Sequence, residues 1–240
     1  MTKSGFDPAT EAAMSNTYPH YQVRLDDGRL IELTSPDRIL PEAWSRVQGL
    51  PEWTRLSYHQ CSNCPFDELR IERCPAAAAV AQLVENFTEV VSFQKVDLVI
   101  VRANGQYSVR GSAQMVVFAM LMEFVSRAKC PYLFDPSADK GFFFLCLDVD
   151  QLLYRFFASF LIQHHLLSSG EPDPNAVNWH RFQQYMGEIR VSLEGLLERI
   201  QAYCHEDANI NALTGAISIS KLLEEHWDDS LRLFKDMTFH

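Results

Sequence analysis

Four cysteines set the strongest constraint on how this chain folds. Cys61, Cys64 and Cys74 follow the spacing Cys-x2-Cys-x9-Cys, and the fourth, Cys130, lies far along the sequence. Thiolates that bind one metal ion are often paired across two intervening residues, because a tight turn brings both sulfurs to the same side of the chain. If all four thiols meet at one closed, four-coordinate site, the chain must bring residue 130 back to the loop 61–74.

The residues alone leave the identity of such a centre open. Zinc is the first expectation, since four thiolates form a common structural zinc site. An iron–sulfur cluster is the alternative, because Cys64, Cys74 and Cys130 each precede proline and Cys-Pro occurs among iron–sulfur ligands. Pro65 also stands where many zinc knuckles use a glycine with positive φ, which proline cannot adopt. The third interpretation is that the thiols bind no metal and are small buried side chains.

Other residues near this pattern carry their own expectations. Cys74 is expected at the N-cap of a helix that begins at Pro75, where the helix dipole lowers a thiol pKa. His59 is a further candidate ligand, although an ordinary strand position with a hydrogen bond also explains it. Cys146 and Cys204 have no partner at metal-binding spacing and are expected to be core or interface thiols.

The charge balance argues against a nucleic-acid or membrane surface. Asp and Glu number 31 against 21 Lys and Arg, which gives a net charge of −10, and no basic cluster is present. The N-terminal residues contain no apolar segment of the kind that a secretory signal needs. The apolar runs elsewhere are too short, or too interrupted by charged residues, to span a bilayer. The expectation is a soluble, cytoplasmic protein whose cysteines are reduced.

The first half of the chain predicts a small antiparallel sheet. Asp27-Gly28 separates two alternating runs within residues 21–33, which predicts a hairpin with a type I′ turn. Asn104-Gly105 divides residues 96–110 in the same way and predicts a second hairpin. The alternation over residues 54–59 predicts one further strand, which runs into the cysteine block.

Helices dominate the second half. Apolar residues recur at helical spacing, and the segments end at proline, glycine or serine clusters. The helices expected in the first half span residues 42–47 and 75–91. Those expected from there on span residues 113–128, 148–167, 177–203 and 207–227.

Together these elements predict an α+β fold. A small, mostly antiparallel sheet, made of two hairpins and one strand, is expected to pack against a C-terminal helical bundle. Residues 1–20 are expected to be a flexible lead-in, residues 21–111 a β-rich part with the cysteine block and one helix, and residues 112–240 the bundle, continuous with the preceding part.

The cysteine block resembles an uncharacterised bacterial family of domains of unknown function. The shared residues are Trp53-Thr54-x-Leu56, Cys61-x-Asn63-Cys64-Pro65, Cys74-Pro75, Cys130-Pro131 and the late run Asp207-Ala208-x-x-Asn211-Ala212. The chain departs from the family pattern at Gly141-Phe142-Phe143-Phe144, where the family carries His-Leu-Pro-Phe, and at residues 127–129, where the family has small residues. The resemblance implies a shared fold and a shared thiol site, and it implies no activity.

The remaining motifs favour a binding protein over an enzyme. The sequence lacks the common nucleotide-binding, hydrolase and metalloprotease motifs. A dithiol switch at Cys61 and Cys64 is disfavoured by Pro65 and by the missing thioredoxin-type βαβ pattern. Asp207 is interpreted as a helix cap and Asn211 as a hydrogen-bond partner of buried backbone, unless both lie behind the thiol site.

The sequence therefore predicts a metal-binding protein with a structural four-cysteine site that acts as an interaction or regulatory module. Aromatic residues of the bundle, namely Trp179, Phe182 and Trp227, are expected to form a surface for a protein partner or for self-association. The alternative is an iron–sulfur redox or sensory protein that uses the same four cysteines.

Overall fold

The structure is a computed structural model that describes residues 19–36, 39–102, 105–133, 154, 156–161 and 179–225. Several expectations fall outside these ranges: nearly all of the lead-in, the helix start at Asp148, Cys146 and Trp227. No helix among the described residues is long and apolar enough to cross a membrane.

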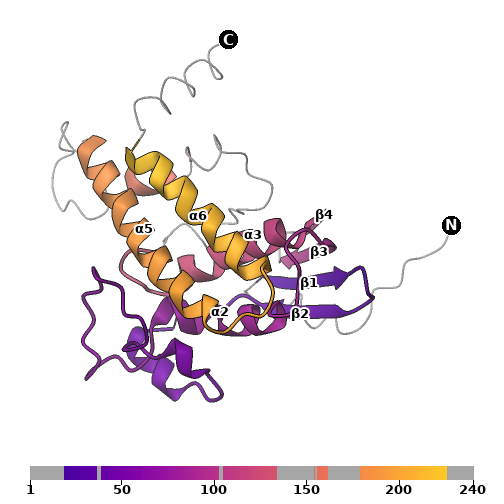
Figure 1. The fold of residues 1–240 in the computed structure, drawn as a ribbon, viewed down its shortest axis with the longest axis horizontal. Coiled ribbons are helices and arrows are strands. Elements are labelled where there is room, and N and C mark those ends of the chain that lie inside the picture. Colours follow the sequence, from indigo (N-terminus) through magenta and orange to yellow (C-terminus); the bar gives the residue numbers. More distant parts are fainter. Residues whose placement is uncertain are drawn as a thin grey trace, which may run out of the picture.

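One four-stranded antiparallel sheet forms the β part. It contains β1 (His20–Leu25), β2 (Leu30–Thr34), β3 (Lys95–Arg102) and β4 (Gly105–Ser112), in the order β2-β1-β3-β4. Both predicted hairpins are thus confirmed, and β1 joins them by pairing with β3 (Figure 1). The α+β fold class is confirmed as well, with the C-terminal helices packed on the sheet.

The turn of the first hairpin is longer than expected. The Gly28 N–H donates to the Leu25 carbonyl at 3.0 Å, and the Leu25 N–H donates to the Arg29 carbonyl at 2.9 Å. Gly28 has a φ of 89°, but Asp27 does not share a positive φ, as a type I′ turn requires. The connection is therefore a four-residue turn closed by a left-handed glycine.

The predicted strand over residues 54–59 is wrong. The short 3-10 helix η2 (Glu52–Thr54) ends there, and only the isolated bridge between Arg55 and Arg73 follows. The cause is local, because the Thr54 hydroxyl donates back to the Pro51 carbonyl at 2.7 Å and curls the chain. The chain then turns again at His59, whose φ is 48°.

Two helices adjoin the cysteines in sequence, one beginning after Cys74 and the other ending before Cys130. The helix α2 (Pro75–Asn86) begins with proline at its first position and ends earlier than predicted, because the Thr88 hydroxyl donates to the Val84 and Glu85 carbonyls. The helix α3 (Ala113–Arg127) begins where Ser112 accepts a hydrogen bond from the Met115 N–H. The short helix near residue 42 is the 3-10 helix η1 (Pro41–Arg46).

Two longer helices complete the described fold. The helices α5 (Trp179–Gln201) and α6 (Ala208–Glu225) confirm the last two predicted helices and lie side by side (Figure 1). The prediction that the Asp207 side chain caps α6 is wrong. Its carboxylate instead accepts hydrogen bonds from the Ser92 N–H and hydroxyl at 2.7 and 2.9 Å, and the Asn211 amide donates to the same carboxylate rather than to buried backbone.

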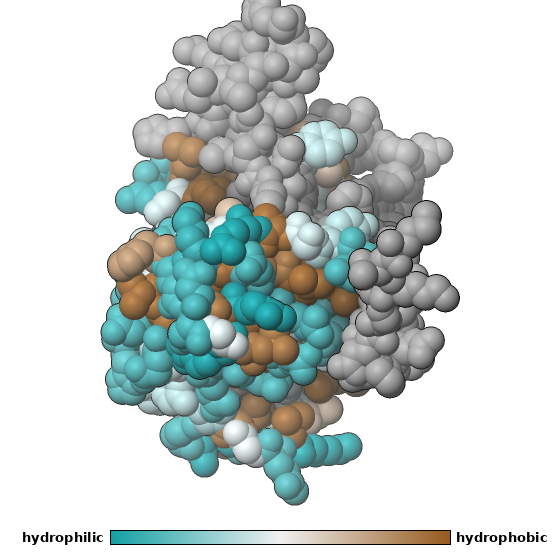
Figure 2. All heavy atoms as spheres, turned by 90° about the vertical axis from the view of Figure 1, so that its right-hand side faces the viewer, coloured by the Kyte–Doolittle hydropathy of each residue, from teal (hydrophilic) through white to brown (hydrophobic). Residues whose placement is uncertain are grey.

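The core lies between one face of the sheet and the helices. Alternate residues of the strands, such as Val23 and Leu98, point into it and join apolar residues of α2, α3, α5 and α6. Phe182 is fully buried in this core against Phe157 and Phe160, so the prediction that it forms a binding surface is wrong. The sheet end of the molecule presents mostly hydrophilic residues with apolar ones between them (Figure 2).

Candidate functional site: a four-thiol cavity

Three separate parts of the chain deliver the four thiols. Cys61 and Cys64 lie on one turn, closed by a hydrogen bond of 3.0 Å from the Cys64 N–H to the Cys61 carbonyl. Cys74 occupies the N-cap of α2, as predicted, and its N–H donates to the Thr54 carbonyl at 2.8 Å. Cys130 follows the end of α3, where Lys129 has a left-handed φ of 57° and redirects the chain.

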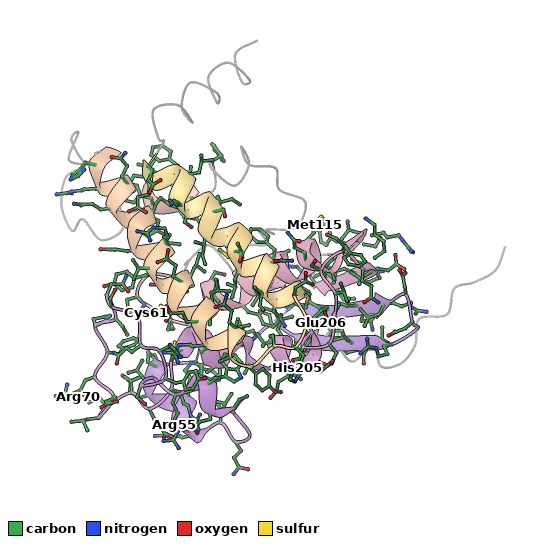
Figure 3. All side chains as sticks on the ribbon, in the orientation of Figure 1. Arg55, Cys61, Arg70, Met115, His205 and Glu206 are labelled. Atoms are coloured by element: carbon green, nitrogen blue, oxygen red, sulfur yellow. The ribbon has the colours of Figure 1, made fainter. Side chains whose placement is uncertain are left out.

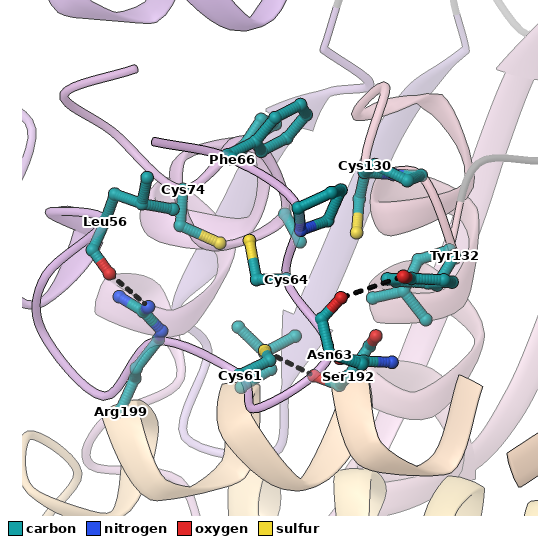
Figure 4. A pocket seen from close by; sticks show the side chains of 16 residues that line it. Leu56, Cys61, Asn63, Cys64, Phe66, Cys74, Cys130, Tyr132, Ser192 and Arg199 are labelled. Carbon is teal, nitrogen blue, oxygen red and sulfur yellow. Dashed lines mark hydrogen bonds between the residues drawn. The ribbon is translucent and has the colours of Figure 1, made fainter. Parts of the chain in front are cut away.

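All four thiols line one small cavity. Its volume is about 20 Å³, which is room for a single water molecule or ion. In Figure 4, the sulfurs of Cys64 and Cys74 are turned toward each other, Cys61 lies against α5, and Cys130 approaches from the opposite side. The rest of the wall is largely apolar and includes Phe66 and Leu196.

Helix α5 forms the floor beneath the Cys61–Cys64 turn. The Cys61 thiol lies 3.8 Å from the Ser192 carbonyl, and the Asn63 side-chain amide donates to the Glu188 carbonyl at 3.1 Å. The Tyr132 hydroxyl donates to the Asn63 carbonyl at 2.8 Å, which ties the segment after Cys130 to the same turn. The helix and the segment around residue 130 therefore hold the turn from two sides.

Gly195 allows the closest approach of α5 to this turn. A Cβ at this position would lie 2.6 Å from the Cys61 sulfur. Glycine inside a helix is less favourable than alanine by about 1 kcal/mol, so a helical glycine often has a packing reason. Here the reason is the thiol that lies against the bare helix backbone.

Arg199 lies one turn further along α5 and lines the same cavity. It is only 1 % exposed, and its guanidinium donates to the carbonyls of Trp53, Arg55 and Leu56 at 3.0, 2.6 and 3.1 Å. Its Nε–H is buried and has no acceptor among the described residues. The sequence interpretation missed both Gly195 and Arg199. A glycine within a long helix and an arginine beside its apolar stripe were the available signals.

Burial dominates the electrostatics of Cys61, Cys74 and Cys130. It raises the pKa of Cys61 to about 11 and that of Cys130 to about 12. It also raises the pKa of Cys74, although the Arg199 charge and the first N–H groups of α2 act in the opposite direction. The expected net lowering of the Cys74 pKa is therefore wrong, because desolvation of the thiolate outweighs the effect of the helix terminus.

The thiols are near one another but not arranged as ligands. Within the ranges that the structure describes, no group of three or more His, Cys, Asp or Glu side chains is placed to hold a metal ion. Binding an ion would thus require the thiols to change rotamer and converge on the cavity that they already line. His59 does not line this cavity, and its ring faces Glu198 at 3.3 Å.

The other candidate residues lie apart from the cavity. Asp207 accepts hydrogen bonds from Ser92 and from the Asn211 amide, and neither Asp207 nor Asn211 lines the cavity. Cys204 accepts a hydrogen bond from the Asn209 amide at 3.3 Å and packs against the core, as predicted for it. Figure 3 shows the neighbouring His205 and Glu206 on a different part of the molecule from Cys61.

The fold and the thiol cavity define an α+β protein with a cysteine-lined site between a loop and a helix bundle. The chain belongs to the family described as Domain of unknown function (DUF6901), whose pattern matches residues 18–240. This confirms the expected membership of an uncharacterised domain family. No curated protein and no solved structure matches the chain.

Proposed function

We propose that Cys61, Cys64, Cys74 and Cys130 bind one metal ion, zinc in the first instance, in a structural centre. The observation that carries this proposal is that four of the five described cysteines line a single ion-sized cavity, although they come from three parts of the chain. Core thiols without a shared role would be expected to scatter through the structure, as Cys204 does.

The size of the cavity favours one ion over a cluster. A volume of about 20 Å³ accepts a single ion once the thiols turn inward, whereas an iron–sulfur cluster would require the loop 61–74 to move outward. The iron–sulfur alternative retains one supporting observation, namely that three of the four thiols precede proline. A protein with such a cluster on the same four cysteines would have a redox or sensory role.

The proposed role of the centre is to fasten the loop part of the molecule to the helices. Cys61 and Cys64 lie on a turn that packs against α5, Cys74 is the N-cap of α2, and Cys130 follows α3. An ion bound by all four would link these three helices through one point. We further propose that the protein so stabilised serves as an interaction or regulatory module, with another protein or a second copy as its partner.

Metal analysis of protein purified without oxygen tests the centre directly. We expect about one zinc per chain, no iron or sulfide, and no visible absorption band. Removing the ion should lower the melting temperature by roughly 5–10 °C when the reference contains zinc at about a hundred times its Kd. Iron with sulfide and a brown colour would instead establish the cluster.

The variant Cys130→Ser and its control Cys204→Ser separate the site from the other thiols. Cys130→Ser should lose the ion and the stabilisation that it provides, because one of four ligands is gone. Cys204→Ser should keep both, because Cys204 lies outside the cavity. Wild-type protein that holds no metal, before and after incubation with zinc or with iron and sulfide, would overturn the proposal.

A further inference from the structure

Arg199 is a buried cation without a carboxylate partner. It is 1 % exposed, and in the part of the chain that the structure describes no Asp or Glu pairs with it. The adjacent Glu198 faces His59 instead. A guanidinium is effectively always charged in proteins, and a buried charge is normally paired with an opposite one. Three backbone carbonyls supply dipoles but no negative charge.

The position of Arg199 on α5 directs its side chain toward the thiols. Gly195, four residues earlier, lies on the same face of the helix and touches the Cys61 sulfur. Side chains on a helix lean toward its N-terminus, so Arg199 leans toward Gly195 and the cavity. Figure 4 shows the guanidinium beside Leu56 at one edge of the group of thiols.

We propose that Arg199 is the positioning residue and counter-charge of an anionic metal–thiolate centre formed by Cys61, Cys64, Cys74 and Cys130. This inference rests on the proposed function. Four thiolates around a divalent ion carry two net negative charges, and the guanidinium offsets one of them. The unsatisfied Nε–H is the donor left over for a metal-bound thiolate after the other guanidinium nitrogens bind the carbonyls.

The charge of Arg199 also affects the equilibrium between the metal-loaded site and the site without an ion. Without a bound ion, the guanidinium contacts only backbone carbonyls and has no anionic partner among the described residues. Loading releases the thiol protons and creates the negative charge that the buried cation lacks. Arg199 therefore favours the loaded state over the metal-free state, which a purely structural arginine would not do.

Variants of Arg199 test this role through metal affinity. We expect Arg199→Gln to weaken zinc binding roughly tenfold to a hundredfold in competition with a chromophoric chelator. Arg199→Lys, which keeps the charge, should recover most of this loss. The control Arg181→Gln removes an exposed charge from the same helix and should leave the affinity unchanged.

The melting temperature with and without zinc distinguishes this role from a structural one. If Arg199 only clamps the carbonyls, Arg199→Gln lowers both melting temperatures equally and leaves the affinity intact, which would overturn the inference. If wild-type protein binds no metal at all, the proposed function itself fails.

A measurement on the wild-type protein covers the case in which Arg199→Gln does not fold. The Arg199 Nε–H resonance, assigned by its loss in Arg199→Lys, should shift when the protein is loaded with zinc. An unchanged resonance in protein that holds one zinc ion would contradict the inference while leaving the metal centre in place.

Discussion

Single residues decide how closely the helices approach the thiols. Gly195 has no side chain where Cys61 lies, and Lys129 adopts a left-handed φ just before Cys130. Both positions serve to place a cysteine rather than to fill the core. Substitutions at such sites should therefore affect metal binding more than their size alone suggests.

Alanine at position 195 gives the sharpest test of this geometry. The new methyl group would meet the Cys61 sulfur at 2.6 Å, so we expect the turn to shift and the free energy of unfolding to fall by about 1–3 kcal/mol. Zinc affinity should fall with it, as measured by chelator competition.

Gly215 provides a matched control for that substitution. It lies within α6, and a Cβ there would have no neighbour within 4 Å. Gly215→Ala should stabilise the protein by about 0.5–1 kcal/mol, because alanine is the better helix former. Equal effects of the two substitutions would mean that Cys61 does not depend on the bare backbone of α5.

At the level of the elements, hydrogen bonds from side chain to backbone connect segments that are far apart in sequence. Arg199 binds three carbonyls of residues 53–56, and Asp207 binds Ser92 just before β3. These contacts join α5 and the start of α6 to the loops around the sheet. They are more specific than apolar packing, because each needs one donor and one acceptor in place.

The Asp207–Ser92 contact predicts a dependence of stability on acid. The Ser92 N–H and hydroxyl hold the pKa of Asp207 below its ordinary value, so the folded state keeps the carboxylate charged where the unfolded state binds a proton. The carboxylate therefore contributes to the free energy of unfolding above about pH 4, and this contribution is lost as the pH falls through the lowered pKa of Asp207.

The variant Asp207→Asn measures this contribution. We expect it to be less stable than wild type by about 1 kcal/mol at neutral pH, because the charged acceptor is gone. The difference should shrink as the pH is lowered from 5 toward 2, in urea unfolding at each pH. A difference that stays constant over this range would show that the carboxylate charge is not what Ser92 recognises.

For the whole molecule, the sequence predicted the elements better than their contacts. The hairpins, α3, α5 and the turn with Cys61 and Cys64 follow from periodicity and spacing, which are local properties. The false strand at residues 54–59 arose because alternation cannot reveal a hydrogen bond such as that from Thr54 to Pro51. Arg199 and Gly195 were missed because their neighbours lie more than a hundred residues earlier in the chain.

The proposed metal centre would also control access to the loop between Cys64 and Cys74. Leu69 is 90 % exposed beside Arg70, which points away from the rest of the molecule in Figure 3. The proposed ligands Cys64 and Cys74 flank this loop, so an ion bound by them would restrict the local opening that proteases need. We expect chelation to accelerate tryptic cleavage after Arg70 several-fold, as followed by mass spectrometry.

Cleavage after Arg29, in the turn of the first hairpin, is the internal reference for that experiment. This turn is distant in sequence from every thiol and is held by its own hydrogen bonds. Its cleavage rate should be the same with and without the ion. A parallel rise at both sites would indicate global unfolding rather than release of the loop.

The position of α5 under the Cys61–Cys64 turn has a consequence for synthesis. The ribosome releases the first three thiols well before residue 130, and the helix that supports them emerges later still. A nascent chain therefore exposes Cys61, Cys64 and Cys74 without the fourth proposed ligand until Cys130 emerges. If the proposed ion binds, it can reach its final surroundings only after α5 has emerged, so we expect zinc capture to follow the synthesis of residue 201.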